Sequence, residues 1–399
     1  MTRAGVRRAV LVALPCVDVM TEIGLASAFP QLRSAYGSVL HASVVVSAGP
    51  LFAVLTGWIW GALARWLWMK RSVALAMSGW AVVTAGLGMS IDVFMGALIL
   101  RALQGIFAAG FAALPFIALS RGSNNARDRA RGMGVLEVSI SAGAIAAPIS
   151  VGTLLAVAPG FVLPALGFVT VGLLALWLAA GGDAAGARAS AVNEAVADEG
   201  VPVTAGREHA GQPWSLRLAR WVMLPTFFAS GIALILSASE SLIPTVAEAL
   251  FDSVVIGKTL TMAFELAVVC GIVLKARRPG VRYGVPLLLS VLIAASFLLG
   301  WYGSAGPAIW LMVIAGFPVG AGVTMGNEYA ASNLVGFEEV GMGLYSTLRI
   351  SGSFLGPLVL NVAYPGVLLV LAAVSLGCAC LVLPQRHRLH SANCRHRRA

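Results

Sequence analysis

Charged residues are scarce in this chain. Only 11% of its 399 residues are Asp, Glu, Lys or Arg, whereas 59% are hydrophobic. A soluble domain usually has about a quarter of its residues charged, so the scarcity excludes an ordinary water-soluble fold. Apolar runs of about 20 residues span a bilayer as helices, and the length leaves room for about twelve of them. The sequence therefore predicts an all-α polytopic membrane protein with twelve transmembrane helices.

The chain also lacks the short motifs of common catalytic sites. It has no G-x-x-x-x-G-K-[ST] phosphate loop, no H-E-x-x-H and no serine elbow, so neither ATP hydrolysis nor these hydrolase chemistries are expected. Its five cysteines follow no paired spacing. Three histidines accompany Cys394 only in a short basic tail, which is a weak signal for a metal. We expect no enzyme, no cofactor and no metal site.

Apolar runs separated by charged or turn-forming clusters mark the predicted spans. Their approximate bounds are 9–29, 43–65, 72–91, 93–120, 132–157, 161–181, 217–240, 256–276, 283–303, 307–332, 341–363 and 365–384. The one long polar stretch, 181–213, is rich in Ala, Gly and Glu, as flexible linkers are. The predicted domains are a six-helix half at 1–181, a cytoplasmic linker at 182–215, a second six-helix half at 216–385 and a basic tail at 386–399.

Basic residues fall on alternate connections between the spans. If the N-terminus is inside, only Arg33 and Lys258 fall on the outer side. This positive-inside pattern predicts a bacterial inner (cytoplasmic) membrane protein with both termini cytoplasmic. It also accounts for the net charge of +10 without a nucleic-acid partner. The expected partners are a small-molecule substrate, protons and membrane lipid, and the chain is expected to be monomeric.

The chain repeats itself at an offset of 209 residues. The segment RGMGVLEVSISAGAIAAPIS, from Arg131, aligns without a gap with VGMGLYSTLRISGSFLGPLV, from Val340. Gly143 then matches Gly352, and Pro148 matches Pro357. Span five therefore corresponds to span eleven, which predicts two pseudo-symmetric six-helix halves. Transporters built from such repeats place their substrate site between the halves.

Three motifs resemble signatures of the major facilitator superfamily, most closely its twelve-helix drug/proton antiporters. Arg101-Ala-Leu-Gln104-Gly105 resembles R-x-x-Q-G, and the segment from Gly143 to Gly152 resembles G-x-x-x-G-P-x-x-G-G. The segment 61–71 is a degraded form of the loop G-x-L-x-D-R-x-G-R-R/K. The second motif is associated in that family with exporters that work by antiport. The resemblance implies the family's fold and transport by alternating access.

The sequence departs from these signatures at several positions. Arg65 stands where the loop motif has Asp, and Trp68 stands where it has Gly. In the family that Asp joins a charge relay that stabilises one gate, and the opposite charge of Arg65 puts such a gate in doubt. Ala147 and Val151 replace two glycines of the antiporter motif.

The motif glycines and prolines suit a mobile helix interface. Glycine lets another helix approach closely, and a proline within a helix permits a kink. Plain helix packing needs the same residues, so that alternative stays open. The predicted gating and packing residues are Gln104, Gly105, Gly143, Pro148 and Gly152 in the first half, and Gly352, Gly356 and Pro357 in the second.

Ionisable residues inside the spans are candidates for function, because each costs about 2.5–3.5 kcal/mol to insert and usually faces a polar cavity. The proposed proton-coupling and substrate residues are Asp18, Glu22, Arg101, Glu137, Glu265 and Arg349. Glu265 and Arg349 both fall near mid-depth and could pair or bind substrate groups of opposite sign. Glu137 falls in the inner half of its span. Asn327 and Glu328 fall near an inner helix end, where a solvated role is as plausible.

Helix arithmetic brings three of these residues together. Asp18 and Glu22 are four residues apart and share a helix face. At 1.5 Å per residue, Glu22 lies roughly 20 Å from the inner side and Arg101 about 12 Å from the outer side. In a hydrocarbon core about 30 Å thick these depths nearly coincide. Two close carboxylates do not both ionise easily in a poorly solvated cavity, whereas Arg101 favours their charged forms.

Such a carboxylate could exchange a proton for a substrate. The sequence therefore predicts a proton antiporter that exports a drug-like molecule or an endogenous metabolite such as a metallophore. The buried acids and Arg101 are compatible with cationic or zwitterionic substrates. A proton-coupled uptake symporter on the same fold is the alternative, and a membrane-embedded enzyme or receptor is a more distant one.

Overall fold

The computed structural model describes residues 2–121, 126–180, 254–277 and 305–333, with short pieces at 232, 235, 236, 239, 345, 369, 370 and 372–377. In this part of the chain all regular structure is α-helical. Seven of the described helices are long and apolar enough to cross a membrane. The predicted all-α membrane fold is confirmed.

The long helices follow the predicted spans closely. Those of the first half are α1 (Arg3–Ser27), α3 (Val39–Trp66), α4 (Trp68–Ser90), α5 (Phe94–Arg121), α6 (Ala126–Ile149) and α8 (Pro159–Ala179). Those of the second half are α13 (Val254–Arg277) and α15 (Ala305–Asn333). Most predicted bounds lie within about six residues of the observed ones. The predicted spans 217–240, 283–303, 341–363 and 365–384 lie largely or wholly outside the described residues.

The chain between the first two spans forms a short helix that the apolar runs did not predict. This helix, α2 (Phe29–Tyr36), ends at Gly37, whose φ of 63° is left-handed. The hydroxyl of Tyr36 donates to the Ile91 carbonyl oxygen at 2.5 Å and so fastens α2 to the end of α4. Burial, with the charge of Asp92 adding to it, raises the pKa of Tyr36 to about 12.

The fifth predicted span, 132–157, is broken near Pro148. Helix α6 ends at Ile149, and after Ser150 the chain continues as α7 (Val151–Val157). Proline cannot donate a backbone hydrogen bond, and a break at this point follows from that loss. A Cβ atom on Gly143 would lie 2.5 Å from the Cys16 carbonyl oxygen, so α6 packs directly on α1. Helix packing alone explains this contact, and a gating role for these residues stays a prediction.

The turn between α3 and α4 carries a strained residue. Trp68 has a φ of 64°, a left-handed conformation that is unfavourable for residues other than glycine. The conformation costs an L-residue about 1–2 kcal/mol. The loop motif that this segment resembles has glycine at this position, so the turn keeps the backbone conformation that glycine would adopt although the residue is Trp.

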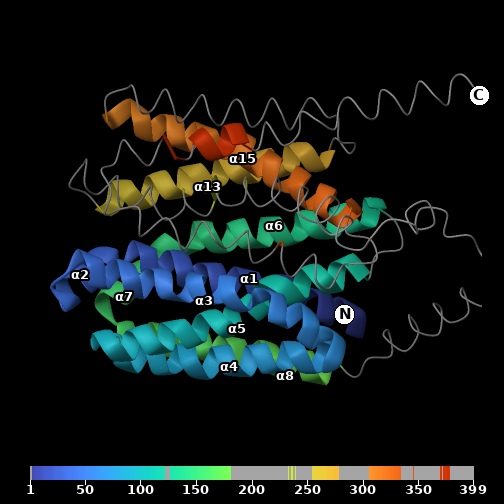
Figure 1. Ribbon diagram of the computed structural model, residues 1–399, viewed down its shortest axis with the longest axis horizontal. Helices are drawn as coiled ribbons and strands as arrows, with labels where there is room; N and C mark the ends of the chain where they lie inside the picture. The colour runs from blue at the N-terminus through green and yellow to red at the C-terminus, as the bar shows by residue number, and fades with distance from the viewer. Residues whose placement is uncertain are drawn as a thin grey trace, which may run out of the picture.

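Figure 1 shows how the helices are arranged. Helices α1 and α6 lie in the middle, with α3, α4, α5 and α8 on one side and α13 and α15 on the other. We call the end that carries Arg7, Arg71, Arg131 and Lys275 the basic end; α1, α4 and α6 run away from it, and α3, α5, α13 and α15 run toward it.

The described helices reflect the repeat. Shifted by 209 residues, α3 and α5 fall at 248–275 and 303–330, where α13 and α15 lie. The pairs α3–α5 and α13–α15 are each extensively packed. The repeat that the motif alignment predicts therefore extends to helix packing.

Candidate functional site

A buried arginine joins the first and fifth helices of the described chain. Arg101 of α5 is wholly buried, and its Nη2 forms an ion pair with Oε2 of Glu22 on α1. Its Nη1 donates to Oε1 of Gln104, one turn further along α5. The prediction that Arg101 lies close to the acids of α1 is confirmed, whereas its role in transport stays a prediction.

Gln104 extends the hydrogen-bond network from Arg101 to a third helix, α4. Its Nε2 donates to the Thr84 hydroxyl of α4 at 2.6 Å, and all three side chains, Arg101, Gln104 and Thr84, are fully buried. Because Gln104 accepts from the arginine through one amide atom and donates through the other, its orientation is fixed. The spacing R-x-x-Q places both side chains on one face of α5.

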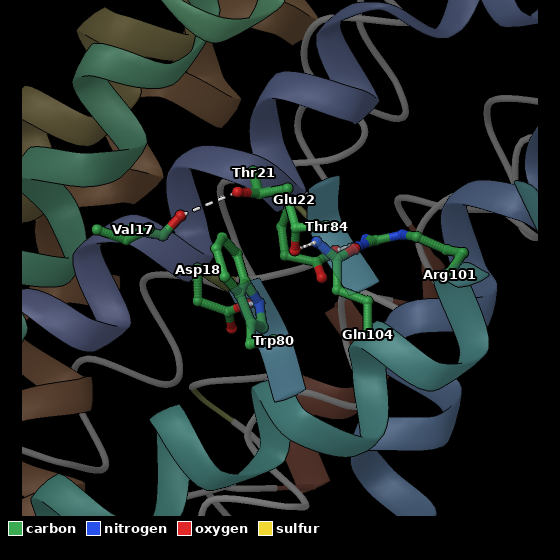
Figure 2. Close-up of polar contacts among 8 residues, drawn as sticks. All are labelled: Val17, Asp18, Thr21, Glu22, Trp80, Thr84, Arg101 and Gln104. Atoms are coloured by element: carbon green, nitrogen blue, oxygen red, sulfur yellow. Dashed lines mark hydrogen bonds and ion pairs between the residues drawn. The ribbon is translucent and has the colours of Figure 1, made fainter. Parts of the chain in front are cut away.

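Asp18 has a partner of its own on α4. The indole Nε1 of Trp80 donates to Oδ1 of Asp18 at 3.2 Å. Trp80 is fully buried and stacks on Phe111, with ring centroids 5.3 Å apart. Packing against Phe111 thus holds the indole so that its N–H faces the Asp18 carboxylate. The indole is uncharged, so this hydrogen bond brings no second cation to the acids. Figure 2 shows the acids of α1 facing Trp80, Arg101 and Gln104.

The two acids remain within reach of water. Asp18 and Glu22 are only partly buried, and 17% of the Glu22 side chain is exposed. Their neighbours Val17 and Thr21 are buried. We call Asp18, Glu22, Trp80, Thr84, Arg101 and Gln104 the charge cluster. The two carboxylates in it are partly exposed, while the cation is fully buried.

Close packing of α3 against α5 seals the cation. A Cβ atom on Gly105 would overlap the Gly49 carbonyl oxygen, so the two backbones are in direct contact. A Cβ atom on Gly49 would in turn lie 2.6 Å from the Arg101 guanidinium carbon. The glycine of R-x-x-Q-G therefore brings the α3 backbone over the arginine next to it.

A second polar constellation links the two halves. The Asn327 side chain of α15 donates from Nδ2 to Oε1 of Glu137 on α6 at 2.6 Å. Its Oδ1 accepts a hydrogen bond from the Tyr345 hydroxyl. The exposed fractions of Glu137, Asn327 and Tyr345 are 1%, 0% and 0%. We call these three residues the junction.

The halves also meet near the opposite end of the molecule. Nζ of Lys258 on α13 donates to the Thr153 hydroxyl of α7 at 2.9 Å. This contact is exposed to solvent. Helix α13 packs along α6 between the two contacts.

Of the remaining predicted residues, some lie in the described helices and others lie outside the described residues. Glu265 is fully buried in α13. Arg349, Gly352, Gly356 and Pro357 lie outside the described residues, as does the side chain of Glu328. Within the described part of the chain, no three His, Cys, Asp or Glu side chains gather in a way that could hold a metal ion.

Three functional candidates were missing from the sequence prediction: Trp80 and Thr84 in the charge cluster, and Tyr345 in the junction. Trp80 and Thr84 are four residues apart, and this spacing on one face of α4 was an available signal. Asn327 was considered a possible solvated helix end. The observed α15 ends at Asn333, one residue beyond the predicted span, and Asn327 is nevertheless fully buried.

Comparison with known proteins supports a membrane transporter. The family model described as Major Facilitator Superfamily matches residues 11–357. The crystal structure of the human organic anion transporter MFSD10 (TETRAN) is similar in fold, with a TM-score of 0.69 and 19% sequence identity. The match covers 96% of this chain and 98% of that one. No curated protein matches the sequence.

Proposed function

The chain belongs to the Major Facilitator Superfamily, and from that premise we propose that it exports a small organic molecule in exchange for protons. The single observation that carries the proposal is the charge cluster. Asp18 and Glu22 are partly exposed and lie within a span, and Glu22 is paired with the buried Arg101. Ionisable groups at such depth are costly and commonly belong to a substrate or proton path.

The proposed chemistry is a competition for one carboxylate. In its ionised form Glu22 holds the Arg101 guanidinium and can attract a cationic group of a substrate. When Glu22 takes up a proton it loses that charge, and both attractions weaken. Substrate and proton therefore exclude each other, which couples the outward movement of one to the inward movement of the other.

The residues around the two acids determine how each acid takes part in this competition. Gln104 and Thr84 hold Arg101 in place, so the cation cannot follow a departing proton or substrate. Trp80 donates a hydrogen bond to Asp18 without adding charge. The two acids thus have different partners, and we propose that Glu22 carries the exchanged proton while Asp18 orients the substrate.

The proposed substrate carries a positive or mixed charge. Two acids and one arginine line the cluster, and the arginine is already paired. The fold is shared with an organic anion transporter, so anionic compounds form a separate arm of the test. The proposed location is a bacterial inner membrane, with the basic end and both termini in the cytoplasm.

Proton release from the purified protein tests the proposal. Cationic, zwitterionic and anionic compounds are added to weakly buffered protein in detergent, and the pH change is recorded for wild type and Glu22→Gln. We expect one class of compound to release protons from the wild type and not from the variant. Binding of a compound without proton release from the wild type would overturn the antiport mechanism.

Vesicles of defined orientation distinguish export from uptake. A compound identified by proton release is labelled and supplied to everted vesicles with an imposed proton gradient. Accumulation in everted vesicles supports export, whereas accumulation only in right-side-out vesicles supports the uptake symporter on the same fold.

A further inference from the structure

We propose that Glu137, Asn327 and Tyr345 form the gate that closes the basic end of the transport path, an inference that rests on the alternating-access transport proposed above. The junction joins α6 of the first half to α15 and Tyr345 of the second. If the halves part at the basic end to open a path there, the hydrogen bond between Glu137 and Asn327 must break, whereas the bond between Asn327 and Tyr345 lies within the second half.

The hydrogen bonds of the junction follow a fixed direction. A carboxylate accepts hydrogen bonds only, so the amide nitrogen of Asn327 must face Glu137. The amide oxygen is then left to face Tyr345, whose hydroxyl donates to it. One amide therefore links the carboxylate of one half to the hydroxyl of the other, because it donates through its nitrogen and accepts through its oxygen.

Complete burial gives the junction two stable states, closed and open. A buried polar group without a partner costs far more than one that is bonded or in water. The stable states are therefore a closed one, in which the three side chains bond one another, and an open one, in which water hydrates them. Partial separation, with the groups neither bonded nor hydrated, is unfavourable.

The position of the junction fits a gate at the basic end. Asn327 lies six residues before the end of α15, or about 9 Å along the helix axis. Phe116 of α5 is 1% exposed and meets the Tyr345 ring edge-on, with centroids 6.0 Å apart. The polar contact thus has an aromatic contact of the first half beside it, and together they close the space between α5 and α6 and the second half.

The junction is separate from the degraded loop. Arg65 stands in that loop where the related motif has Asp, and the junction uses no residue of the segment 61–71.

Thiol labelling at Met133 tests the gate. Met133 lies one helical turn from Glu137 toward the basic end of α6 and is 1% exposed. Met133→Cys is made in a full-length chain whose five native cysteines are replaced by serine or alanine, and its reaction with a soluble maleimide is timed. In Asn327→Ala, Glu137 loses this partner in the closed state, and we expect labelling at least about five-fold faster.

Two further variants distinguish loss of the junction's hydrogen bonds from a general loss of folding. Tyr345→Phe removes one hydroxyl and keeps the ring, so it accelerates labelling less than Asn327→Ala does. Glu137→Ala/Asn327→Ala removes both sides of the bond, and we expect it to label more slowly than the product of the two single effects predicts. The matched control is Thr324→Ala, because the Thr324 hydroxyl is buried in the same helix but bonds only the Gly320 carbonyl.

The labelling outcomes separate the gate from the proposed function. Labelling needs no substrate and no proton gradient. Equal labelling rates in Asn327→Ala, Tyr345→Phe and the control, each eluting as a single size-exclusion peak, would overturn the gate whatever the proton-release assay shows. Faster labelling in a protein that releases no protons would support the gate and contradict the antiport mechanism.

Discussion

The charge cluster and the junction are both buried polar constellations, yet they are built in opposite ways. The charge cluster lies within the first half, on α1, α4 and α5, and its acids are partly exposed. The junction spans the two halves, and all three of its side chains are fully buried. The first lies within one half and its acids are partly exposed, whereas the hydrogen bond between the halves in the second opens only when the halves part.

This difference separates chemistry from conformation. A variant of the charge cluster should change which ligand or proton is held and leave labelling at Met133 unchanged. A variant of the junction should change labelling and leave the stoichiometry of proton release unchanged. The following predictions test that separation, in order of decreasing expected effect.

The largest effect is expected from Arg101→Ala. The substitution leaves the Glu22 carboxylate without its cation in a largely buried site, and breaking such a pair costs several kcal/mol. We expect transport in vesicles to fall at least about a hundred-fold. The control is Arg33→Ala, which removes an exposed arginine of α2. Full transport in Arg101→Ala would remove the arginine from the mechanism.

Glu137 offers the sharpest test of the two roles, because two substitutions separate its charge from its hydrogen bond. Glutamine keeps an oxygen that can accept from Asn327, whereas alanine does not. We expect Glu137→Gln to label at Met133 within about two-fold of wild type, and Glu137→Ala at least about five-fold faster. Loss of proton release in Glu137→Gln would instead place Glu137 in the proton path.

A smaller effect is expected from Trp80→Phe. Phenylalanine keeps an aromatic ring against Phe111 and removes the N–H that Asp18 accepts. A hydrogen bond to a charged group contributes about 1.5–3 kcal/mol, so we expect transport to fall about ten-fold with a changed pH profile. Trp60→Phe is the matched control, since the buried Trp60 indole donates to the backbone carbonyl of Ile106. Equal losses in both variants would indicate packing alone.

The exposed contact between the halves should matter less than the junction. Lys258→Met removes the donor to Thr153 near the opposite end, where water can replace it. Exposed polar contacts contribute about 0–1 kcal/mol, so labelling at Met133 should change less than about three-fold. A change as large as that of Asn327→Ala would show that burial does not distinguish the two contacts.

The smallest effect concerns a contact outside both constellations. The pKa of Tyr36 is raised to about 12, so its protonated form stabilises the folded protein at neutral pH. This stabilisation is complete below about pH 10, the ordinary pKa of tyrosine, and is lost as the pH rises through about 12. We expect the melting temperature of wild type to approach that of Tyr36→Phe across this window, with proton release at neutral pH unchanged. A constant difference would contradict the assignment.

Sequence reasoning recovered what depends on hydropathy and on spacing along one helix. Apolar runs located the long helices, and depth arithmetic placed Arg101 beside Glu22. It missed α2, whose eight residues are too few and too polar to form an apolar run. It also missed that Asn327 bonds Glu137, because that contact depends on how α6 and α15 pack, 190 residues apart in sequence.

The glycine contacts show where the two halves differ. Gly105 meets the α3 backbone, and Gly271 and Gly320 bring α13 and α15 into similar contact, each at a place where a Cβ atom would strike a carbonyl oxygen. No residue of the charge cluster is repeated at the corresponding position of α15, where Ile99 to Gly105 become Ala308 to Ile314. The close contacts themselves fall at different positions of the repeat, since Gly105 corresponds to Ile314 and Gly320 corresponds to Phe111. Placing R-x-x-Q-G on α15 would therefore put an arginine beside helices that lack the partners it has on α1 and α4.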